Sequence, residues 1–284
     1  MSQPETPLLS ARLTVSYPGK APVLAGIELE IAEKEIVGLV GQSGSGKSTL
    51  AMAILGLLGN KRARIEGQIL FRGTDLLRLS QEDLRKLRGN SLSLVLQSPL
   101  SSLNPALRIQ TQLREAWRAH RDTTRADCDT AIDSAMASVS LPSARDFLRK
   151  YPSQLSVGQA QRVLIAMAVM HRPALLIADE ATSALDVITQ SEILELFSRL
   201  NREIGMSILY ISHDLPSVAG ICQRIAILHE GRVVECGTTA QIFAAPRHPY
   251  TRRLMSALPQ IPAHGQELPA QTQAAAAGPG HPPA

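Results

Sequence analysis

The chain has 284 residues, of which 44% are hydrophobic, and this is enough for one large core or two smaller ones without disulfides or a structural metal. Its net charge of +4 comes from dispersed lysines and arginines with little aromatic interleaving, so the sequence argues against nucleic acid as a partner. The three cysteines, Cys128, Cys222 and Cys236, lack C-x-x-C spacing, which argues against a zinc or iron–sulfur site and indicates a reducing compartment.

The sequence contains no segment typical of secretion or of membrane insertion. Its first residues lack a basic start followed by an apolar stretch, so we expect no secretory signal. The longest apolar run, residues 163–170, is far short of the ~20 residues that a membrane-spanning helix needs. We therefore expect a cytosolic protein whose role at a membrane, if it has one, depends on partners.

The first elements in the chain are predicted to be strands. Residues 8–17 and 23–31 alternate partly between apolar and polar side chains and flank Pro18-Gly19-Lys20, which predicts two antiparallel strands joined by a turn. Residues 36–40 form an apolar run that predicts a buried strand, and residues 49–58 favour a helix.

A phosphate-binding pattern, G-x-x-x-x-G-K-[ST], lies between that strand and that helix. Its glycines let backbone N–H groups turn inward around phosphate oxygens, and the helix N-terminus adds partial positive charge. Lys47 supplies a mobile charge for the β- and γ-phosphates, and the Ser48 hydroxyl can ligate Mg²⁺. The pattern predicts a nucleotide site, without telling ATP from GTP, with these nucleotide-binding residues: Gly41, Gln42, Ser43, Gly44, Ser45, Gly46, Lys47, Ser48 and Thr49.

The middle of the chain changes from strands to helices. Residues 68–71 and 91–96 read as strands, the second ending at Gln97, and Ser80 with Asp83 resembles a capping box for a helix that runs to about Leu87. From residue 104 to about 151 strand patterns disappear and apolar residues recur at helical spacing, which predicts a helical insertion. These residues are Leu113, Trp117, Ile132, Met136 and Val139.

The second half predicts an alternating α/β region. Residues 174–178, 207–211 and 224–228 read as strands separated by helices around 191–204 and 216–222, an alternation that implies a mostly parallel sheet. Glu230-Gly231 predicts a final hairpin into residues 232–235. Residues 259–284 are rich in proline and alanine and are expected to form a disordered tail.

Two further motifs carry chemistry. The strand at 174–178 ends in Asp179 and Glu180; Asp179 can hold Mg²⁺ through water, and Glu180 can polarise the water that attacks the γ-phosphate. Upstream, Ser156 in Leu155-Ser156-Val157-Gly158-Gln159 predicts the cap of an apolar helix, whose N-terminus is a second anion-binding end.

This last segment resembles the L-S-G-G-Q signature of the ATP-binding-cassette (ABC) family, and residues 8–259 follow that family's order of motifs. The resemblance implies an α/β fold: a P-loop NTPase ABC cassette with a mostly parallel core sheet, an antiparallel β subdomain and an inserted helical subdomain. The implied ATPase domain covers 8–258, with the helical subdomain at about 104–170.

The resemblance also implies roles for single residues. Tyr17 is similar to the aromatic residue that stacks on adenine, Gln97 to a catalytic-site glutamine that also contacts Mg²⁺ with Ser48 and Asp179, and His213 to the switch histidine beside the catalytic Glu180. In this family the signature of one subunit closes on the nucleotide of the other. That role falls to these residues: Ser156, Gly158, Gln159 and, across the dimer, Asp186.

The sequence departs from the family pattern twice. Val157 stands where the signature has its first glycine, and Ala181 follows the Asp-Glu pair where proline is usual. Ser156 and Gly158 remain to meet phosphate, so we expect activity, although a β-branched residue restricts the loop.

Residues 98–105 and residues 248–254 resemble the ATPase subunits of bacterial dipeptide, oligopeptide and nickel importers. That branch implies a second ABC ATPase, two membrane permeases, an extracytoplasmic solute-binding protein and a position on the cytoplasmic face of the inner membrane. Some relatives carry an iron–sulfur cluster near the C-terminus, but no cysteine follows Cys236, so none is predicted here.

Two other functions remain open at this point. A non-transport ABC ATPase of DNA repair, translation or cell division usually carries coiled coils, zinc modules or two cassettes, and this chain has none of them. A degenerate cassette that binds ATP without hydrolysis is disfavoured because Glu180 and His213 are present. Val157, which departs from the signature, is the one residue that favours it. The transported solute does not touch this subunit, so these residues do not identify it.

Overall fold

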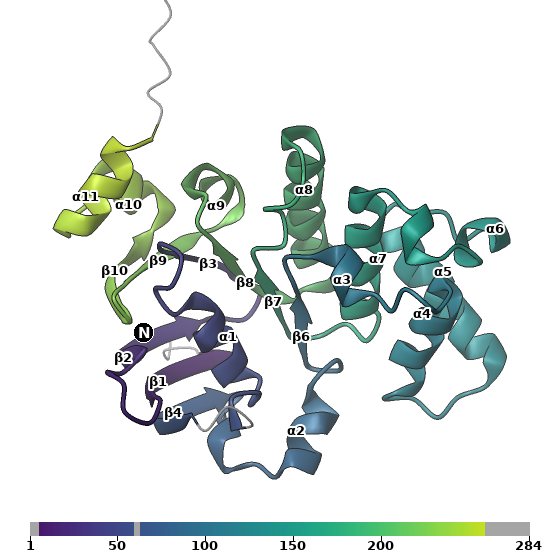
Figure 1. Ribbon diagram of the computed structural model, residues 1–284, viewed down its shortest axis with the longest axis horizontal. Helices are drawn as coiled ribbons and strands as arrows, with labels where there is room; N and C mark the ends of the chain where they lie inside the picture. Colours follow the sequence, from purple (N-terminus) through teal and green to yellow (C-terminus); the bar gives the residue numbers. More distant parts are fainter. Residues whose placement is uncertain (1–5, 60–62, 259–284) are drawn as a thin grey trace, which may run out of the picture.

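Residues 6–59 and 63–258 are described by the computed structural model, and their strands form two sheets (Figure 1). The predicted tail, residues 259–284, lies outside the described residues. The larger sheet has six strands in the order β10-β9-β3-β8-β7-β6, and the smaller has four in the order β2-β1-β4-β5.

The six-stranded sheet is parallel except at one edge. Its central strands are buried on both faces, which explains why they read as continuous apolar runs. Strand β10 turns back at Glu230-Gly231 and pairs antiparallel with β9, so the predicted parallel sheet and final hairpin are both confirmed. The strands are β3 (Ile36–Val40), β6 (Leu92–Val95), β7 (Leu175–Asp179), β8 (Ser207–Ser212), β9 (Arg224–His229) and β10 (Arg232–Thr238).

The four-stranded sheet is antiparallel, and the predicted pairing of its first two strands is confirmed. Strand β4 is longer than the predicted 68–71, because it pairs with β1 along its whole length, from Leu9 opposite Phe71 to Ser16 opposite Arg64. The strands are β1 (Leu9–Ser16), β2 (Leu24–Ile31), β4 (Arg64–Phe71) and β5 (Thr74–Asp75).

Helices gather at one end of the large sheet, where the sequence predicts a helical insertion (Figure 1). These are α3 (Pro99–Ser102), α4 (Ile109–Arg118), α5 (Arg125–Ser138), α6 (Arg145–Leu148) and α7 (Val157–Val169). Elsewhere lie α1 (Lys47–Ile54), α2 (Gln81–Leu87), α8 (Val187–Ile204), α9 (Leu215–Ile221), α10 (Thr239–Ala244) and α11 (Pro249–Ser256), with short 3₁₀ turns at Leu76–Arg78 and Pro152–Gln154.

Two helices begin at the serines that the sequence predicts as caps. Ser156 caps α7 as predicted and also forms a reciprocal capping box with Gln159. Ser80 caps α2 by accepting from the Asp83 N–H, but the reciprocal bond of the predicted capping box is not formed there. Helix α1 differs from its prediction: it begins at Lys47, inside the phosphate-loop motif, and ends at Ile54 rather than near residue 58.

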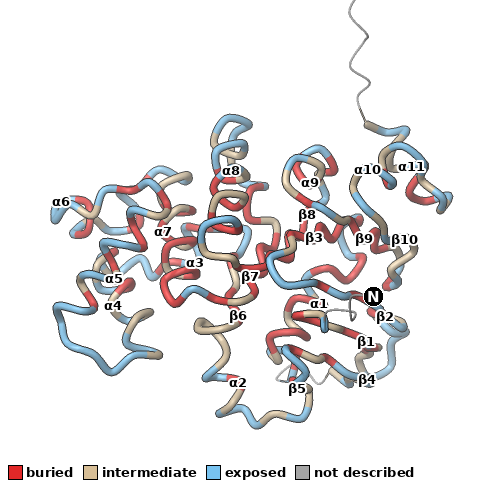
Figure 2. The backbone as a smooth tube through the Cα atoms, turned by 180° about the vertical axis from the view of Figure 1, so that it is seen from behind, coloured by how far each residue is buried: buried red, intermediate tan, exposed pale blue. Residues whose placement is uncertain are grey.

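Two apolar cores lie on opposite faces of the six-stranded sheet, and Figure 2 shows the buried backbone concentrated along it. Strand β8 divides its side chains between them: Ile208 and Tyr210 join the core with α4, α5 and α7 to α9, whereas Leu209 and Ile211 join the core with α1 and the four-stranded sheet. The central strands are thereby fixed from both sides, and their carboxyl ends carry the residues described next.

Candidate functional site

The phosphate loop joins β3 to α1 and has the backbone that its glycines permit. Gly44 and Gly46 have positive φ values of 81° and 109°, a region where a side chain is strained. At Gly41 a Cβ would collide with the Leu228 carbonyl oxygen. The loop can therefore keep its backbone N–H groups facing inward at the N-terminus of α1.

Lys47 closes this loop from within. Its ammonium donates hydrogen bonds to the carbonyl oxygens of Gly41 at 2.7 Å and Gln42 at 3.0 Å. The side chain is buried, and burial lowers the pKa of Lys47 while the charges of Glu180 and Asp179 oppose that shift. The Lys47 ammonium is therefore held where it can bind a phosphate oxygen.

A cleft of about 340 Å³ opens above the loop. Residues from the loop, from the end of β6 and from the end of β7 meet in it, so it brings together half of the nucleotide, catalytic and metal residues that the sequence predicts. Its lining is Val23, Ser43, Gly44, Gly46, Lys47, Ser48, Thr49, Gln97, Asp179 and Glu180; of these, Val23 had no motif to mark it.

The Asp179 side chain suits a cation site because it is buried and has an oxygen without a hydrogen-bond donor among the described residues. It is buried, and its Oδ1 atom has no hydrogen-bond partner within residues 6–59 and 63–258. Burial raises the pKa of Asp179, although the Ser48 hydroxyl and the Lys47 ammonium oppose the rise. Nowhere in those residues do three His, Cys, Asp or Glu side chains converge, so a Mg²⁺ here would depend on phosphate, hydroxyl and water oxygens as well as on Asp179.

Glu180 occupies a strained position between two partners. Its φ of 49° lies in the left-handed region, which is unusual for a residue other than glycine. Its Oε1 atom lies 3.9 Å from the Lys47 Nζ and 3.4 Å from the His213 Nδ1. Strands β7 and β8 are neighbours with Asp179 opposite Ile211, and this register brings the two following turns together.

The signature residues form a second group, outside the cleft. Ser156 caps α7 and Asp186 caps α8, and the hydrogen bonds that Asp186 accepts from Thr189 and Ile188 lower its pKa. The two helix starts touch, because a Cβ on Gly158 would lie 2.8 Å from the Thr189 Cγ2. Ser156, Gly158, Gln159 and Asp186 are thus together, but none of them lines the cleft of the same chain.

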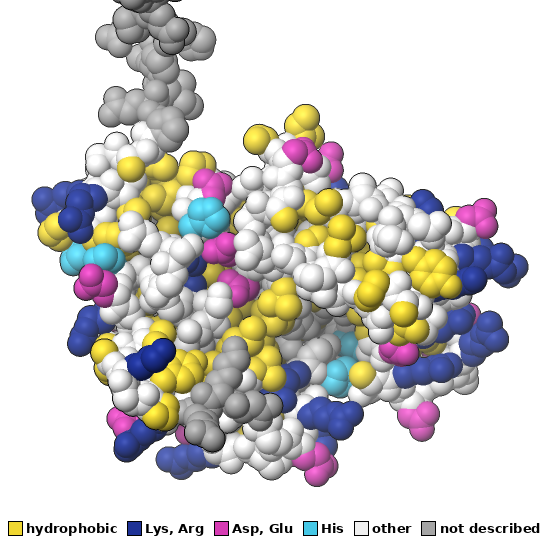
Figure 3. Space-filling view, in the orientation of Figure 1, with side chains coloured by type: hydrophobic (Ala, Val, Ile, Leu, Met, Phe, Trp, Pro, Cys, Tyr) yellow, Lys and Arg dark blue, Asp and Glu magenta, His cyan; other side chains and the backbone are white. Residues whose placement is uncertain are grey.

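Tyr17 does not line the cleft either; it is half-buried at the end of β1, against the core that contains α1. Beside the signature group, Val187 and Ile188 are 82% and 75% exposed, and Figure 3 shows hydrophobic side chains protruding at one end of α8. This exposed apolar surface adjoins the predicted cross-dimer residue Asp186.

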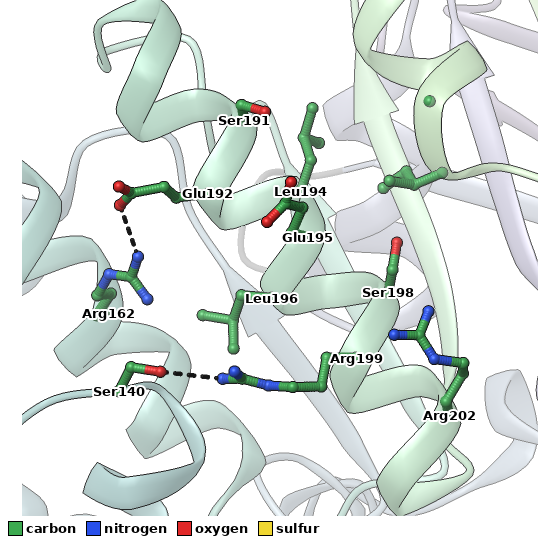
Figure 4. A pocket seen from close by; sticks show the side chains of 12 residues that line it. Ser140, Arg162, Ser191, Glu192, Leu194, Glu195, Leu196, Ser198, Arg199 and Arg202 are labelled. Atoms are coloured by element: carbon green, nitrogen blue, oxygen red, sulfur yellow. Dashed lines mark hydrogen bonds and ion pairs between the residues drawn. The ribbon is translucent and has the colours of Figure 1, made fainter.

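A larger groove, of about 590 Å³, lies between α7, α8 and α9 and away from the phosphate loop (Figure 4). Two arginines cross it. Arg162 pairs with Glu192 at 2.8 Å, and Arg199 donates to the Ser140 hydroxyl at 3.2 Å and to the Ser138 carbonyl at 2.7 Å. The groove contains no phosphate-binding motif, and the contacts of Arg162 and Arg199 join α8 to α7 and to the end of α5.

No helix in residues 6–59 and 63–258 has the length and apolar character needed to cross a bilayer.

Comparison with known proteins gives two family matches and several relatives. A model described as ABC transporter matches residues 24–183, and one described as oligopeptide/dipeptide transporter, C-terminal region, matches residues 234–280. The chain is 39% identical to the dipeptide transport ATP-binding protein DppD of Bacillus subtilis, covering 89% of this chain and 76% of that protein. It is 40% identical to the oligopeptide transport ATP-binding protein OppD of Escherichia coli, covering 90% and 76%.

Solved structures of ABC ATPases have the same fold as this chain. The cbiO1 protein of Clostridium perfringens, part of an ABC transporter complex, superposes with a TM-score of 0.74 at 28% identity, over 85% of this chain and 92% of that one. The ATP-binding cassette MJ0796, a dimer in a post-hydrolysis state bound to ADP and Pi, gives 0.69 at 27% identity, over 81% and 98%. The predicted α/β ABC fold is confirmed, and the chain belongs to the ABC transporter family as one of its ATPases.

Proposed function

We propose that this chain is the ATP-hydrolysing subunit of a bacterial importer that takes up peptides. The observation that carries the proposal is the joint match of one chain to the ABC transporter model and to the C-terminal region of oligopeptide and dipeptide transporters. DppD and OppD, whose printed names refer to dipeptide and oligopeptide transport, support peptides as the substrate class. The non-transport ATPase is not favoured.

The cleft supports a chemical mechanism for ATP hydrolysis. Glu180 accepts a hydrogen bond from the attacking water and polarises it, and His213, whose Nδ1 lies 3.4 Å from the Glu180 Oε1, holds the orientation of the carboxylate. The Lys47 ammonium transfers its hydrogen bonds from loop carbonyls to the β- and γ-phosphates. Tyr17 stacks on the adenine once the base lies against β1.

Ser48, Gln97 and Asp179 hold Mg²⁺ in this proposal. The orphaned Oδ1 atom of Asp179 supports it, because a buried carboxylate oxygen without a donor suits a hard cation. Mg²⁺, when bound, neutralises charge on the phosphates.

A second ATPase subunit completes the site. The separation of the signature group from the cleft of its own chain supports a head-to-tail pair in which Ser156, Gly158, Gln159 and Asp186 of one subunit meet the nucleotide of the other. The dimeric state of a related cassette agrees with such a pair. ATP binding then favours the closed pair, and loss of the γ-phosphate releases it.

The remaining parts of the proposal concern the assembly. The ATPase domain spans 8–258, its helical subdomain at about 104–170 and the loop at Gln97 receive two membrane permeases, and an extracytoplasmic binding protein delivers the solute. The chain then resides at the cytoplasmic face of the inner membrane.

The test is recovery of the full chain from detergent-solubilised native membranes, followed by mass spectrometry and ATPase assays with di- and oligopeptides and with nickel chelates. Two permeases, a second ATPase and stimulation by peptides are the expected result; a Lys47→Ala chain should recover the same partners without the stimulation. Stimulation by nickel alone would replace the substrate class. Recovery of repair, ribosome or division factors without a permease would overturn the proposal.

A further inference from the structure

A chain of buried hydroxyl groups lies next to the Glu180–His213 pair. The Thr182 Oγ1 and the Tyr210 hydroxyl are 2.8 Å apart, and the Tyr210 hydroxyl donates to the Ser217 Oγ at 3.3 Å. The Ser217 hydroxyl donates in turn to the Asp214 carbonyl oxygen at 2.8 Å. All three hydroxyl-bearing side chains are buried, and Tyr210 is completely buried.

The hydrogens of this chain run in one direction. Each hydroxyl has a single hydrogen, and Tyr210 gives its own to Ser217, so Thr182 must be the donor to Tyr210. The Asp214 carbonyl is a pure acceptor and ends the chain. Hydroxyls that donate in series polarise one another, and every member here has a partner, which makes the arrangement a defined structural link.

Both ends of the link are next to a predicted catalytic residue. Thr182 lies two residues after Glu180, in the turn that Ser183 closes by donating to the Glu180 carbonyl oxygen from its N–H and its hydroxyl. Ser212 and Asp214 flank His213, and the Asp214 N–H donates to the Ser212 Oγ at 3.0 Å.

Helix α8 adds a further contact at the His213 end. The Gln190 side-chain amide donates to the Asp214 Oδ2 at 3.0 Å. The turn that carries His213 is thus held from α8 and through Tyr210.

Packing alone does not account for a tyrosine at this position. The ring lies in the core beside Phe197, with ring centroids 6.3 Å apart, and a phenylalanine would fill the same volume. A buried hydroxyl costs free energy unless it forms hydrogen bonds, and this hydroxyl forms them to the turn after β7 and to the helix after the His213 turn.

We propose that Tyr210 is a positioning residue for ATP hydrolysis, which through Thr182 and Ser217 fixes the turn of Glu180 relative to the turn of His213. The inference rests on the proposed function, because it takes Glu180 and His213 as the residues that act on the attacking water. The 3.4 Å separation of the Glu180 Oε1 and the His213 Nδ1 is the quantity that this link controls.

The primary test is Tyr210→Phe in the full chain, assayed for steady-state ATPase activity. We expect kcat to fall about tenfold while KM for ATP stays within about twofold, since the phosphate loop is untouched and only the alignment of the attacking water is lost. The matched control is Tyr250→Phe, which removes a buried hydroxyl that has no hydrogen-bond partner within the described part of the chain; its kcat should equal that of the wild type.

A second pair of variants keeps the test decisive if Tyr210→Phe does not fold. Thr182→Val removes the hydroxyl at nearly constant volume and should reproduce the loss of kcat, whereas Thr182→Ser keeps the hydroxyl and should restore it. Equal activity of the valine and serine variants, or a folded Tyr210→Phe chain with wild-type kcat, would overturn the inference.

Glu180→Gln in the same assay separates this inference from the proposed function. A normal rate in Glu180→Gln would remove the catalytic role of Glu180 and with it the basis of the link. A rate lost in Glu180→Gln but kept in Tyr210→Phe would leave the proposed function standing and refute only the positioning role.

Discussion

Asp179 and Glu180 are adjacent carboxylates with different surroundings. Asp179 ends a buried strand, where burial raises its pKa and one oxygen lacks a donor among the described residues. Glu180 begins the turn that follows, with its carboxylate between Lys47 and His213. The end of the strand at Asp179 and the left-handed turn at Glu180 therefore give the two side chains different surroundings, to which the proposed function assigns metal binding and activation of water.

Replacement of Glu180 by glutamine tests that division. Glu180→Gln should lower ATP turnover by about 100-fold or more, because the amide does not accept a proton from water. ATP affinity should be retained, since the hydrogen bonds of Lys47 to its loop do not involve Glu180. Turnover and equilibrium binding of MgATP measure the two effects. The control is Glu195→Gln, an exposed position on α8 where no change is expected.

We expect His171 to make the stability of the fold depend on pH. It is buried, its Nε2 lies 3.1 Å from the Ala116 carbonyl oxygen and its ring stacks on Trp117. That contact requires the Nε2–H form, so protonation would place a charge on the buried Nδ1. Burial, aided by His120 and Arg121, lowers the pKa of His171 below its ordinary value of 6.5, despite the Ala116 contact.

The unfolded chain accordingly binds the proton first as the pH falls. The contribution of neutral His171 is complete above about pH 6.5 and is lost progressively below it, down to the lowered folded-state pKa. Urea unfolding at a series of pH values should therefore show a steeper loss of free energy of unfolding below pH 6.5 in the wild type than in His171→Gln. Identical slopes for the two proteins would contradict this reading of His171.

Helix α5 depends on two arginines from other helices. The carbonyl oxygen of Ser138, its last residue, accepts a hydrogen bond from Arg199 of α8, and that of Val139, which follows, accepts one from Arg162 of α7. Both cations also face the negative end of the helix dipole. Ser140, which follows with a φ of 57°, turns the chain away and accepts from Arg199 as well. The contacts join the α5 segment to α7 and α8, and Figure 4 shows the one between Arg199 and Ser140.

Loss of this contact should weaken the fold without touching the cleft. Arg199→Leu is expected to lower the free energy of unfolding by about 2 kcal/mol, because two hydrogen bonds from a charged donor disappear and a helix end loses its partner. Arg202→Leu, an exposed arginine on the same helix, should change it by less than about 0.5 kcal/mol. Thermal and urea unfolding give both values, and equal losses would show that the contact at Ser138 is unimportant.

Elements that local sequence determines could be predicted, and elements that depend on distant partners could not. Ile36–Val40 was recognisable as a strand because both of its faces are buried, and Ser80 and Ser156 carry their caps within three residues. Strand β4 begins early because β1 pairs with it, which no pattern near residue 64 encodes. The short helix α3 was not predicted, and its four residues are too few to show periodicity.

The candidate site divides in the same way. The phosphate loop consists of consecutive residues with a characteristic spacing of glycine and lysine, so the sequence alone predicts it. The Asp179-Glu180 pair is likewise recognisable, because it directly follows an apolar strand. The bond between Thr182 and Tyr210 joins residues 28 positions apart and has no motif. Tyr17 shows the converse: its resemblance to an adenine-stacking residue stays a prediction, since it lies outside the cleft lining.

At the scale of the whole molecule, the two residue groups that the proposed function joins into one site lie apart in a single chain. The cleft uses the carboxyl ends of β3, β6 and β7, whereas the signature group stands at the starts of α7 and α8 beside an exposed apolar pair, Val187 and Ile188. Apolar side chains exposed to this degree are common at surfaces that another protein covers.

The C-terminal end of the described chain is expected to contribute stability rather than catalysis. Tyr250 of α11 is buried and its ring stacks on that of His229, with centroids 3.7 Å apart, while the proposed site residues all precede residue 214. Truncation after Leu258 should leave the ATPase rate within about twofold of the full chain.

Truncation after His248 removes Tyr250 and should lower the melting temperature by several degrees, roughly as expected for loss of a buried aromatic side chain. Calorimetry and ATPase assays on the two shortened chains separate these outcomes. A large loss of activity on removing only residues 259–284 would assign that segment a functional role.

The left-handed backbone of Glu180 has a consequence for laboratory evolution. A non-glycine residue in this region costs roughly 1–2 kcal/mol, and glycine would relieve it. One substitution that relaxes the backbone is therefore one that deletes the proposed base. A library of this protein selected for heat resistance alone should enrich Glu180→Gly. The selected variants would be more stable but would not hydrolyse ATP, so any such selection has to include activity.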